Sequence, residues 1–303
     1  MRTIVMIALL AFAVSSCNNS STTEQDNTTS GQIQISVDET YYPLVKTELD
    51  VFHGFYKYAA IEAQYLPETE AMQLLLSDSV RLAIVTRTLT EAEQAYFDQR
   101  KLIPRITKVA IDAVALIVHP DNPDTIISLD QLRQLLAGNP TAWKVGATDS
   151  NSIQVVFDNS NSSTVRYLKE KFSPDFAPYC FAVNTNPEVI NYVANNPRAV
   201  GIIGVNWISD TDDSVSYDFL SKVKVLRISS ETTGPRGLQP YQAYIADSSY
   251  PLIRSLYIVS REARAGLGTG FASFMASDKG QRIVLKSGLV PATMPVRIVE
   301  FKN

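Results

Sequence analysis

Hydroxyl side chains gather where predicted strands give way to predicted helices. The residues at these turns are Thr40, Thr69, Thr86, Ser162, Ser163 and Thr164. The first turn of a helix presents unpaired backbone N–H groups and a partial positive charge, so it can hold an oxyanion, and a hydroxyl there can donate a further hydrogen bond. Each Ser or Thr could instead cap its own helix, which is the commonest use of these residues at such positions. Taken one at a time, each of these residues is expected to cap its helix, and a shared oxyanion site would require the turns to converge.

Short β-type runs and helical stretches alternate along the chain from Gln32 onward. Residues 33–37 alternate apolar and polar side chains, and residues 82–85 form a continuous apolar run of the kind found in buried strands. Helices are predicted over residues 129–137, 164–172, 186–195 and 270–287. Strands that alternate with helices of this length are typical of an α/β fold with largely parallel sheets.

The composition is that of an ordinary globular protein. The 303 residues are 45% hydrophobic and 19% charged, which excludes a disordered chain, a collagen-like repeat and a coiled-coil rod. Lys and Arg number 27 against 31 Asp and Glu, so the net charge is −4, and no basic cluster stands out. Nucleic acid is therefore not an expected partner, because binding it requires a basic surface that displaces counterions.

The first residues have the pattern of a bacterial export signal with a lipid attachment site. Arg2 precedes an apolar stretch over residues 4–14, which is long enough for a signal-peptide core and too short to span a bilayer. The stretch runs into Val14-Ser15-Ser16-Cys17, which resembles a lipobox, in which the cysteine becomes the lipid-bearing N-terminus. We expect a signal peptide over residues 1–16 and lipidation of Cys17. An ordinary secretory peptide with a chance cysteine is the alternative.

Residues 18–32 contain no aliphatic or aromatic side chain. We therefore expect residues 17–32 to form a flexible tether between the lipid and the folded body, because such a segment can bury nothing. This arrangement predicts a protein anchored to a bacterial membrane, with its body in the periplasm or outside the cell. Lipidation of Cys17 leaves Cys180 without a disulfide partner, and the apolar neighbours of Cys180 predict a buried thiol of low reactivity.

The last third of the chain contains three segments in a characteristic order. Residues 250–258 read YPLIRSLYI, residues 271–281 read FASFMASDKGQ, and residues 288–291 read GLVP. They resemble the YPLxRxLY segment, the FxxFxxSxxGQ helix and the exit turn of phosphate-binding proteins of the phosphate ABC transporter. Weaker matches extend the resemblance over nearly the whole mature chain. They lie at residues 40–43, 86–89, 114–122, 161–164 and 201–204.

The resemblance implies an α/β fold of the two-lobed periplasmic-binding-protein type II, with the ligand in a cleft between hinged lobes. Residues 33–118 and 240–303 would form one lobe, and residues 119–239 the other. It also implies that a monomer captures phosphate and delivers it to a membrane permease, without catalytic residues, metal or cofactor. The ligand-binding residues implied are Thr40, Tyr41, Thr69, Thr86, Arg87, Asp158, Ser162, Ser163 and Thr164.

Two charged residues depart from the family pattern. Asp158 stands four residues before Ser162, where better-known members have an arginine, and Arg87 stands where some members have an aspartate. One hypothesis is that Arg87 supplies the cation and Asp158 accepts the proton of hydrogen phosphate, which would reject sulfate. A surface arginine and a turn aspartate are the alternative. Glu68 and Glu70 would oppose an anion if they faced the cleft.

The sequence does not indicate an enzyme. His53 and His119 are the only histidines, and neither has a second ligand-type residue at metal-binding spacing. No nucleophile-elbow or phosphate-loop glycine pattern occurs in the mature chain. One other function stays open because the usual cleft residues are altered. In that alternative, the protein is a family member that binds another oxyanion or a small ligand and acts in signalling or surface binding.

Overall fold

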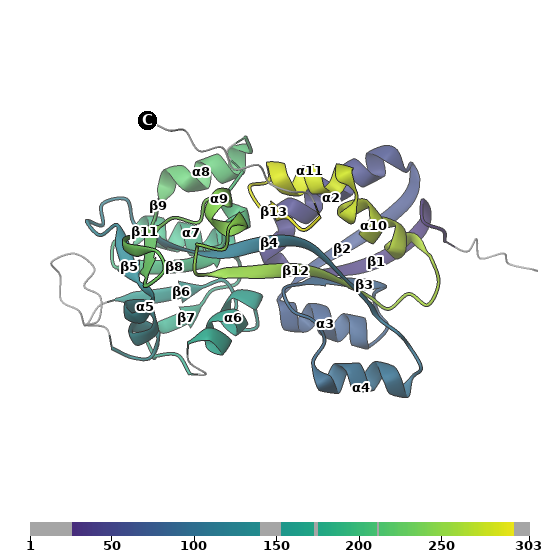
Figure 1. Cartoon of the computed structure of the whole chain (residues 1–303), viewed down its shortest axis with the longest axis horizontal. Helices are drawn as coiled ribbons and strands as arrows, with labels where there is room; N and C mark the ends of the chain where they lie inside the picture. Colours follow the sequence, from purple (N-terminus) through teal and green to yellow (C-terminus); the bar gives the residue numbers. More distant parts are fainter. Residues whose placement is uncertain (1–25, 140–152, 173–174, 211, 294–303) are drawn as a thin grey trace, which may run out of the picture.

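Strands and flanking helices form two lobes joined by a shared strand in the computed structural model of the chain (Figure 1). The structure describes residues 26–139, 153–172, 175–210 and 212–293. The expected signal peptide over residues 1–16 and the expected lipidation site Cys17 lie outside these ranges. Among the helices within them, none is both long enough and apolar enough to cross a membrane.

The strands of the part that we name lobe 1 are β1 (Ser30–Asp38), β2 (Tyr58–Leu66), β3 (Leu82–Val85), β12 (Ile253–Ser260), β13 (Val290–Pro291) and the first part of β4 (Arg105–Val118). Its helices are η1 (Glu39–Tyr41), α2 (Tyr42–Phe55), α3 (Glu68–Leu76), α4 (Glu91–Gln99), α10 (Leu267–Ala276) and α11 (Asp278–Lys286). The sheet order is β2-β1-β3-β12-β4, with β1 parallel to β2 and β3 and with β12 antiparallel to its neighbours. Figure 1 shows α2, α10 and α11 on one face of this sheet and α3 and α4 on the other.

The strands of the part that we name lobe 2 are β5 (Ile126–Ser128), β6 (Gln154–Phe157), β7 (Cys180–Ala182), β8 (Ala199–Gly204), β9 (Lys224–Val225), β10 (Arg227–Ser230) and β11 (Gly234–Leu238). Its helices are α5 (Leu129–Leu136), α6 (Ser163–Lys171), α7 (Asn186–Asn195), η4 (Val205–Trp207), α8 (Ser214–Lys222) and α9 (Gln242–Ala246). The sheet continues from β4 as β8-β6-β7, and β11, β10 and β5 form a separate three-stranded sheet. The mixed α/β fold is the one expected from the sequence.

The lobes are joined where β4 passes from one sheet to the other. β4 pairs with β12 up to Ala113 and with β8 from Val114 onward. The returning chain crosses beside it, because the Val114 N–H donates to the Leu252 carbonyl at 2.8 Å and the Tyr250 hydroxyl donates to the Val114 carbonyl at 2.9 Å. Pairing with lobe 2 therefore begins before the predicted boundary at residue 119.

Local sequence signals account for the main elements. β3 and β8 are apolar runs in which every residue is buried, as expected of inner strands covered on both faces. α5 begins with a capping box, in which Ser128 and Gln131 each accept the backbone N–H of the other.

In β7, Cys180 is partly buried, and burial raises the pKa of its thiol to about 12, which makes the thiol a poor nucleophile.

Two segments differ from the sequence expectation. The single helix predicted over residues 270–287 is two helices, because the extended backbone of Ser277 ends α10 and begins α11. The end of the predicted tether belongs to the folded body. β1 already begins at Ser30, and Asp26 accepts the Leu267 N–H at the start of α10 and pairs with Arg264. Strand pairing uses backbone groups, so a segment without apolar side chains can still join a sheet.

Candidate functional site

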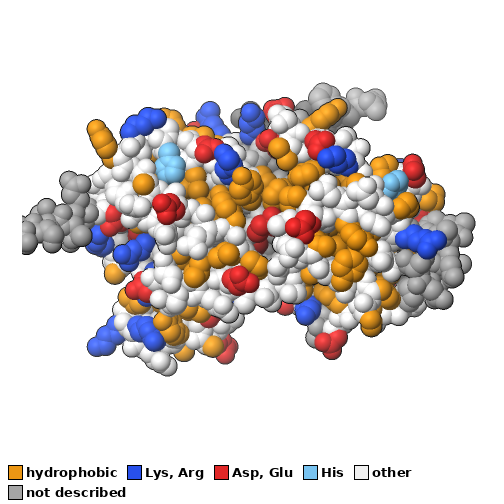
Figure 2. Space-filling view, turned by 180° about the vertical axis from the view of Figure 1, so that it is seen from behind, with side chains coloured by type: hydrophobic (Ala, Val, Ile, Leu, Met, Phe, Trp, Pro, Cys, Tyr) orange, Lys and Arg blue, Asp and Glu red, His pale blue; other side chains and the backbone are white. Residues whose placement is uncertain are grey.

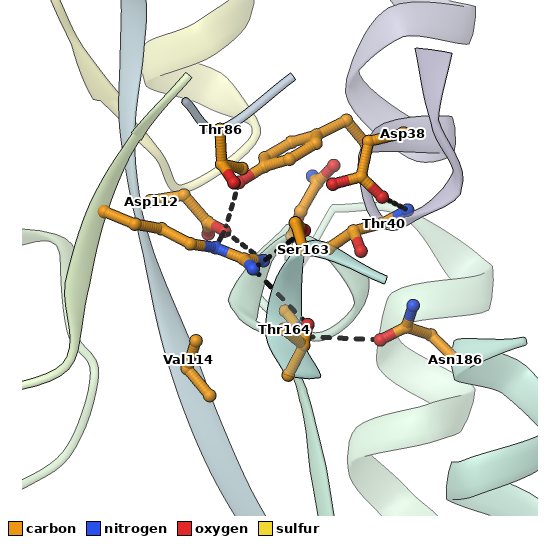
Figure 3. Close-up of polar contacts among 12 residues, drawn as sticks. Asp38, Thr40, Thr86, Asp112, Val114, Ser163, Thr164 and Asn186 are labelled. Atoms are coloured by element: carbon orange, nitrogen blue, oxygen red, sulfur yellow. Dashed lines mark hydrogen bonds and ion pairs between the residues drawn. The ribbon is translucent and has the colours of Figure 1, made fainter. Parts of the chain in front are cut away.

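Turns from both lobes converge at the junction of the lobes (Figure 3). Lobe 1 supplies Thr40 in η1, and lobe 2 supplies the turn from β6 into α6 and Asn186 at the start of α7. Thr40, Ser163, Thr164 and Asn186 have 0% exposed surface, so the lobes are closed on these side chains. We call the following residues the central cluster: Thr40, Asp112, Asp158, Ser162, Ser163, Thr164, Asn186 and Arg254.

Arg254 is the cation of the central cluster. Its Nε and Nη2 atoms each donate to Asp112 Oδ2 at 3.0 Å. Its Nη1 donates to the hydroxyls of Ser163 at 3.0 Å and Thr164 at 3.3 Å, in the first turn of α6. The guanidinium lies 5.5 Å from the centre of the Tyr41 ring. Nearby Tyr41 and Asp112 keep the pKa of Arg254 above its already high ordinary value despite burial, so the group remains charged.

Arg254 is not among the residues that the sequence places at the site, although it lies in the segment YPLIRSLYI over residues 250–258. Leu252, Arg254 and Leu256 are every second residue of this extended segment, so their side chains share one face, and all three are buried. The register places Arg254 opposite Asp112, which is itself buried in the apolar part of β4. Each of these two strands has a charged residue on its buried face. Because buried charges in proteins are normally paired with an opposite charge, this pattern was the signal that could have indicated the ion pair.

Asp158 is held by donors from both lobes. Its carboxylate accepts the Ser162 hydroxyl at 2.6 Å, the Asn186 side-chain amide at 3.2 Å and the Thr40 hydroxyl at 3.4 Å. It is only 1% exposed. Burial raises the pKa of Asp158, although hydrogen bonds from Ser162 and from the Asn159 N–H act in the opposite direction.

A second group of polar residues closes the edge of the junction, and we call Glu68, Thr69, Thr86, Asn161 and Arg166 the rim cluster. Arg166 of lobe 2 pairs with Glu68 of lobe 1 at 2.5 Å and donates to the Thr86 hydroxyl at 2.7 Å. Glu68 also accepts the N–H of Thr86 at 2.6 Å. Thr69 donates its N–H and its hydroxyl to the Asn161 carbonyl at 3.3 and 3.2 Å.

The structure thus brings together most of the residues expected at the site. Members of the central cluster include Thr40, Asp158 and Ser162–Thr164, and Tyr41 adjoins it through a 2.9 Å hydrogen bond from its hydroxyl to Asp112. Thr69 and Thr86 lie in the rim cluster, where they contact protein groups of the other lobe.

Arg87 does not hold the position expected of it. Both of its terminal nitrogens donate to Glu93, at 2.6 and 2.7 Å, and one of them also donates to the Thr88 carbonyl. Glu93 is the third residue of α4 and forms a capping box with Thr90. The expected role of Arg87 as the cation of the cleft is therefore not supported, because its charge is neutralised within its own turn and Arg254 holds that role.

The capping alternative applies to one of the hydroxyl residues. Ser162 caps α6 by accepting the Val165 N–H at 3.2 Å, while its hydroxyl proton goes to Asp158. Thr69 lies inside the first turn of α3, which has no side-chain cap. η1 is capped by Asp38, which accepts the Thr40 N–H at 3.2 Å. The hydroxyls of the other candidate residues therefore remain free of a capping role and can hydrogen-bond to a ligand or to other side chains.

Carboxylates are abundant beside the central cluster. Asp38 is 1% exposed, and its Oδ2 atom has no hydrogen-bond partner. Burial and then the charge of Glu68 raise the pKa of Asp38 to about 7. Burial likewise raises the pKa of Glu39 to about 7, although Asn186 donates to it at 2.9 Å. Acidic side chains also reach the surface near the middle of the face shown in Figure 2. An added anion would therefore meet less negative charge at low pH than at high pH.

Comparison with known proteins gives a domain match and named relatives. Residues 22–279 match the PBP superfamily domain, which covers most of the chain. A Pseudomonas aeruginosa protein named phosphate-binding protein PstS is 24% identical over 290 residues, with 89% of this chain and 85% of the relative covered. The Staphylococcus saprophyticus protein of the same name is 24% identical over 259 residues, with 83% of this chain and 77% of the relative covered.

Solved structures share the fold. An ABC transporter substrate-binding protein from Clostridium perfringens, solved with bound phosphate, has a TM-score of 0.72 at 19% identity, with 86% of this chain and 100% of that chain covered. An ABC-type phosphate transport receptor from Vibrio cholerae has a TM-score of 0.65 at 22% identity, with the same coverage. These structures confirm the expected fold, and the domain match spans most of the sequence. The chain therefore belongs to the PBP superfamily.

Proposed function

We propose that this chain is the solute-binding protein of an ABC importer and that it captures phosphate between its two lobes. The observation that carries the proposal is the contact of Arg254 with the Ser163 and Thr164 hydroxyls at the N-terminus of α6. A fixed guanidinium beside unpaired helix N–H groups favours a tetrahedral oxyanion. The relatives' name, phosphate-binding protein PstS, supports phosphate as that ion.

The closed lobes have to part before an ion can enter, because the central hydroxyls have no exposed surface. The crossing of β4 beside Leu252 is the natural place for this movement, because β4 changes its pairing partner there from β12 to β8. Closure on phosphate would then bring Thr40 of lobe 1 toward Ser163 and Thr164 of lobe 2. The closed form would dock on a membrane permease, and the ATPase of the transporter would drive transport.

We also propose that the protein is a lipoprotein of the bacterial cell envelope, anchored through Cys17. The support is the sequence Val14-Ser15-Ser16-Cys17 after an apolar stretch. In a bacterial host labelled with radioactive palmitate, the full chain should carry label and fractionate with membranes. A Cys17→Ser variant should lose both properties, and label retained on that variant would reject the assignment.

One observation favours a second candidate function. Asp158 of the central cluster and the neighbouring Asp38 and Glu39 form no ion pair with the two arginines. Arg254 pairs with Asp112, and Arg166 pairs with Glu68 and Glu170. A cleft with this excess of carboxylates suits a small ligand that carries its own hydrogen-bond donors. The protein would then bind a different ligand in a signalling or surface-binding role.

Isothermal titration distinguishes the two candidates. The chain from Asn18 onward would be unfolded and refolded to remove any carried ligand, and phosphate and then sulfate would be titrated. We expect binding of phosphate in the micromolar range or tighter and no heat from sulfate. Absence of heat from both anions, with a folded sample by circular dichroism, would reject phosphate and favour the second candidate.

A further inference from the structure

We infer that the Asp158 carboxylate occupies the anion position of the central cluster and competes there with the incoming ligand. The inference rests on the proposed function, because it concerns the same cleft. It makes Asp158 the residue that limits affinity for an oxyanion. It also replaces the hypothesis that Asp158 accepts a proton from the ligand.

The donors around Asp158 are those that a bound oxyanion would require. Hydroxyls from both lobes, a side-chain amide and the Asn159 backbone N–H all point to this one carboxylate. Thr40 and Ser162 were expected to bind the ligand, and in the structure both donate to Asp158. All of these donors are neutral, since Arg254 directs its nitrogens to Asp112, Ser163 and Thr164.

The carboxylate has little capacity left for a ligand. An ionised carboxylate offers about four lone-pair positions. Three of them are taken by the Thr40 and Ser162 hydroxyls and the Asn186 amide. A proton from hydrogen phosphate would have to reach the carboxylate among these donors, which hold the closed form together.

The internal carboxylate of Asp158 also connects the two lobes. The Thr40 hydroxyl of lobe 1 reaches Asp158 of lobe 2, and Asn186 bridges Asp158 to Glu39 of lobe 1 at 3.2 and 2.9 Å. An oxyanion that enters has to displace these contacts, and it meets the negative charge of Asp158 at short range. Like charges in such proximity weaken binding strongly.

The test compares two variants of Asp158 with a matched control, all in the chain from Cys17 onward with Cys17→Ser. Asp158→Ala removes the carboxylate, and Asp158→Asn removes its charge and replaces one acceptor oxygen with an NH2 donor. Asp218→Ala removes an exposed carboxylate of the same lobe, which pairs with Lys222 on the surface. Phosphate is titrated into each protein at pH 7.5. We expect affinity to rise at least about tenfold in Asp158→Ala, less in Asp158→Asn, and not at all in Asp218→Ala.

Small-angle scattering without phosphate gives an independent readout. Asp158→Ala should have a larger radius of gyration than the parent chain, because the lobes lose their internal contact. If the Asp158 variants bind phosphate more weakly than the parent chain, or with the same affinity, the inference is overturned. If Asp158→Ala fails to fold, the affinity of Asp158→Asn decides. If no protein binds phosphate but Asp158→Ala opens, the inference stands and phosphate as the ligand is rejected. If no protein binds phosphate and the lobes stay closed, the inference is wrong.

Discussion

The central cluster and the rim cluster both join the lobes, but they place their charges differently. In the rim cluster, Glu68 of lobe 1 pairs with Arg166 of lobe 2, so opposite charges meet across the junction. In the central cluster, Arg254 pairs with Asp112 on the neighbouring strand of its own lobe. Within the described residues, its hydrogen bonds across the junction go to the Ser163 and Thr164 hydroxyls.

Because of this difference, the rim cluster acts in closing the lobes, and the central cluster acts in binding an anion. The Arg166 side chain is 25% exposed, so water can replace its contacts when the lobes part. The Arg254 side chain is 2% exposed and is held by a strand partner whose position does not depend on closure. Arg254 is therefore placed before a ligand arrives, which reduces the entropy cost of binding. The rim cluster adds stability to the closed form alone.

Loss of Arg254 should have the largest effect. Arg254→Ala leaves Asp112 buried without a cation and with the Tyr41 hydroxyl as its remaining donor. We expect this to lower the free energy of unfolding by about 3–5 kcal/mol and to abolish phosphate binding. Chemical denaturation and titration measure the two effects. The double variant Arg254→Gln with Asp112→Asn removes both charges, so it should recover part of the stability while binding remains lost. Phosphate binding by a folded double variant would remove Arg254 from the site.

Glu48 provides a reference carboxylate that lacks the donors of both clusters. It is buried in α2, neither oxygen has a hydrogen-bond partner, and burial raises its pKa from 4.5 to about 9. Between these values the folded chain keeps a proton that the unfolded chain has lost, so stability falls as pH rises through this window. Glu48→Gln should therefore stabilise the protein by about 2 kcal/mol at pH 8 and by little at pH 4.

Thermal unfolding at several pH values measures the effect of Glu48→Gln. The exposed substitution Glu91→Gln, in the first turn of α4, serves as its control and should leave the pH profile unchanged. A Glu48→Gln profile parallel to that of the parent chain would show that Glu48 is ionised in the folded protein.

Removal of the rim cation should weaken closure without removing the anion site. Arg166→Ala takes one charged partner from Glu68, while the two donors of Thr86 remain. We expect phosphate affinity to fall about three- to tenfold, which corresponds to about 1 kcal/mol of lost closure energy. Titration against an Arg133→Ala control, which removes an exposed arginine of the same lobe, measures the change. A loss as large as that of Arg254→Ala would erase the distinction between the two clusters.

Arg87→Ala should have the smallest effect on binding. Its pairing with Glu93 joins the turn before α4 to the first turn of that helix and does not reach the cleft, so we expect an unchanged dissociation constant for phosphate and a loss of about 1 kcal/mol of stability. Titration and thermal unfolding of the same sample measure both quantities. A clear drop in affinity would restore Arg87 to the cleft.

The sequence predicted the parts of the site that depend on local patterns. Strand alternation followed by Ser and Thr located Thr40 and residues 162–164, because a turn after a strand is defined by its own residues. The pairing of Arg87 with Glu93 was also local, since Thr90 and Glu93 form a capping box that can be read directly from the chain.

The rest of the site depends on pairings between distant segments. Arg254 contacts Asp112, 142 residues earlier in the chain, and the register of β12 on β4 determines that contact. Arg166 meets Glu68 only because the lobes close. The same reason explains Asp158, which accepts hydrogen bonds from Thr40 and Asn186 of two distant turns besides that from the nearby Ser162.

A crystal structure of the chain grown with phosphate would test the account most directly. We predict phosphate between the lobes, within hydrogen-bond distance of Arg254 and the first turn of α6, with Arg254 still paired with Asp112 and with Asp158 turned away from Thr40. Closed lobes that contain no phosphate, or phosphate bound away from Arg254, would contradict the account.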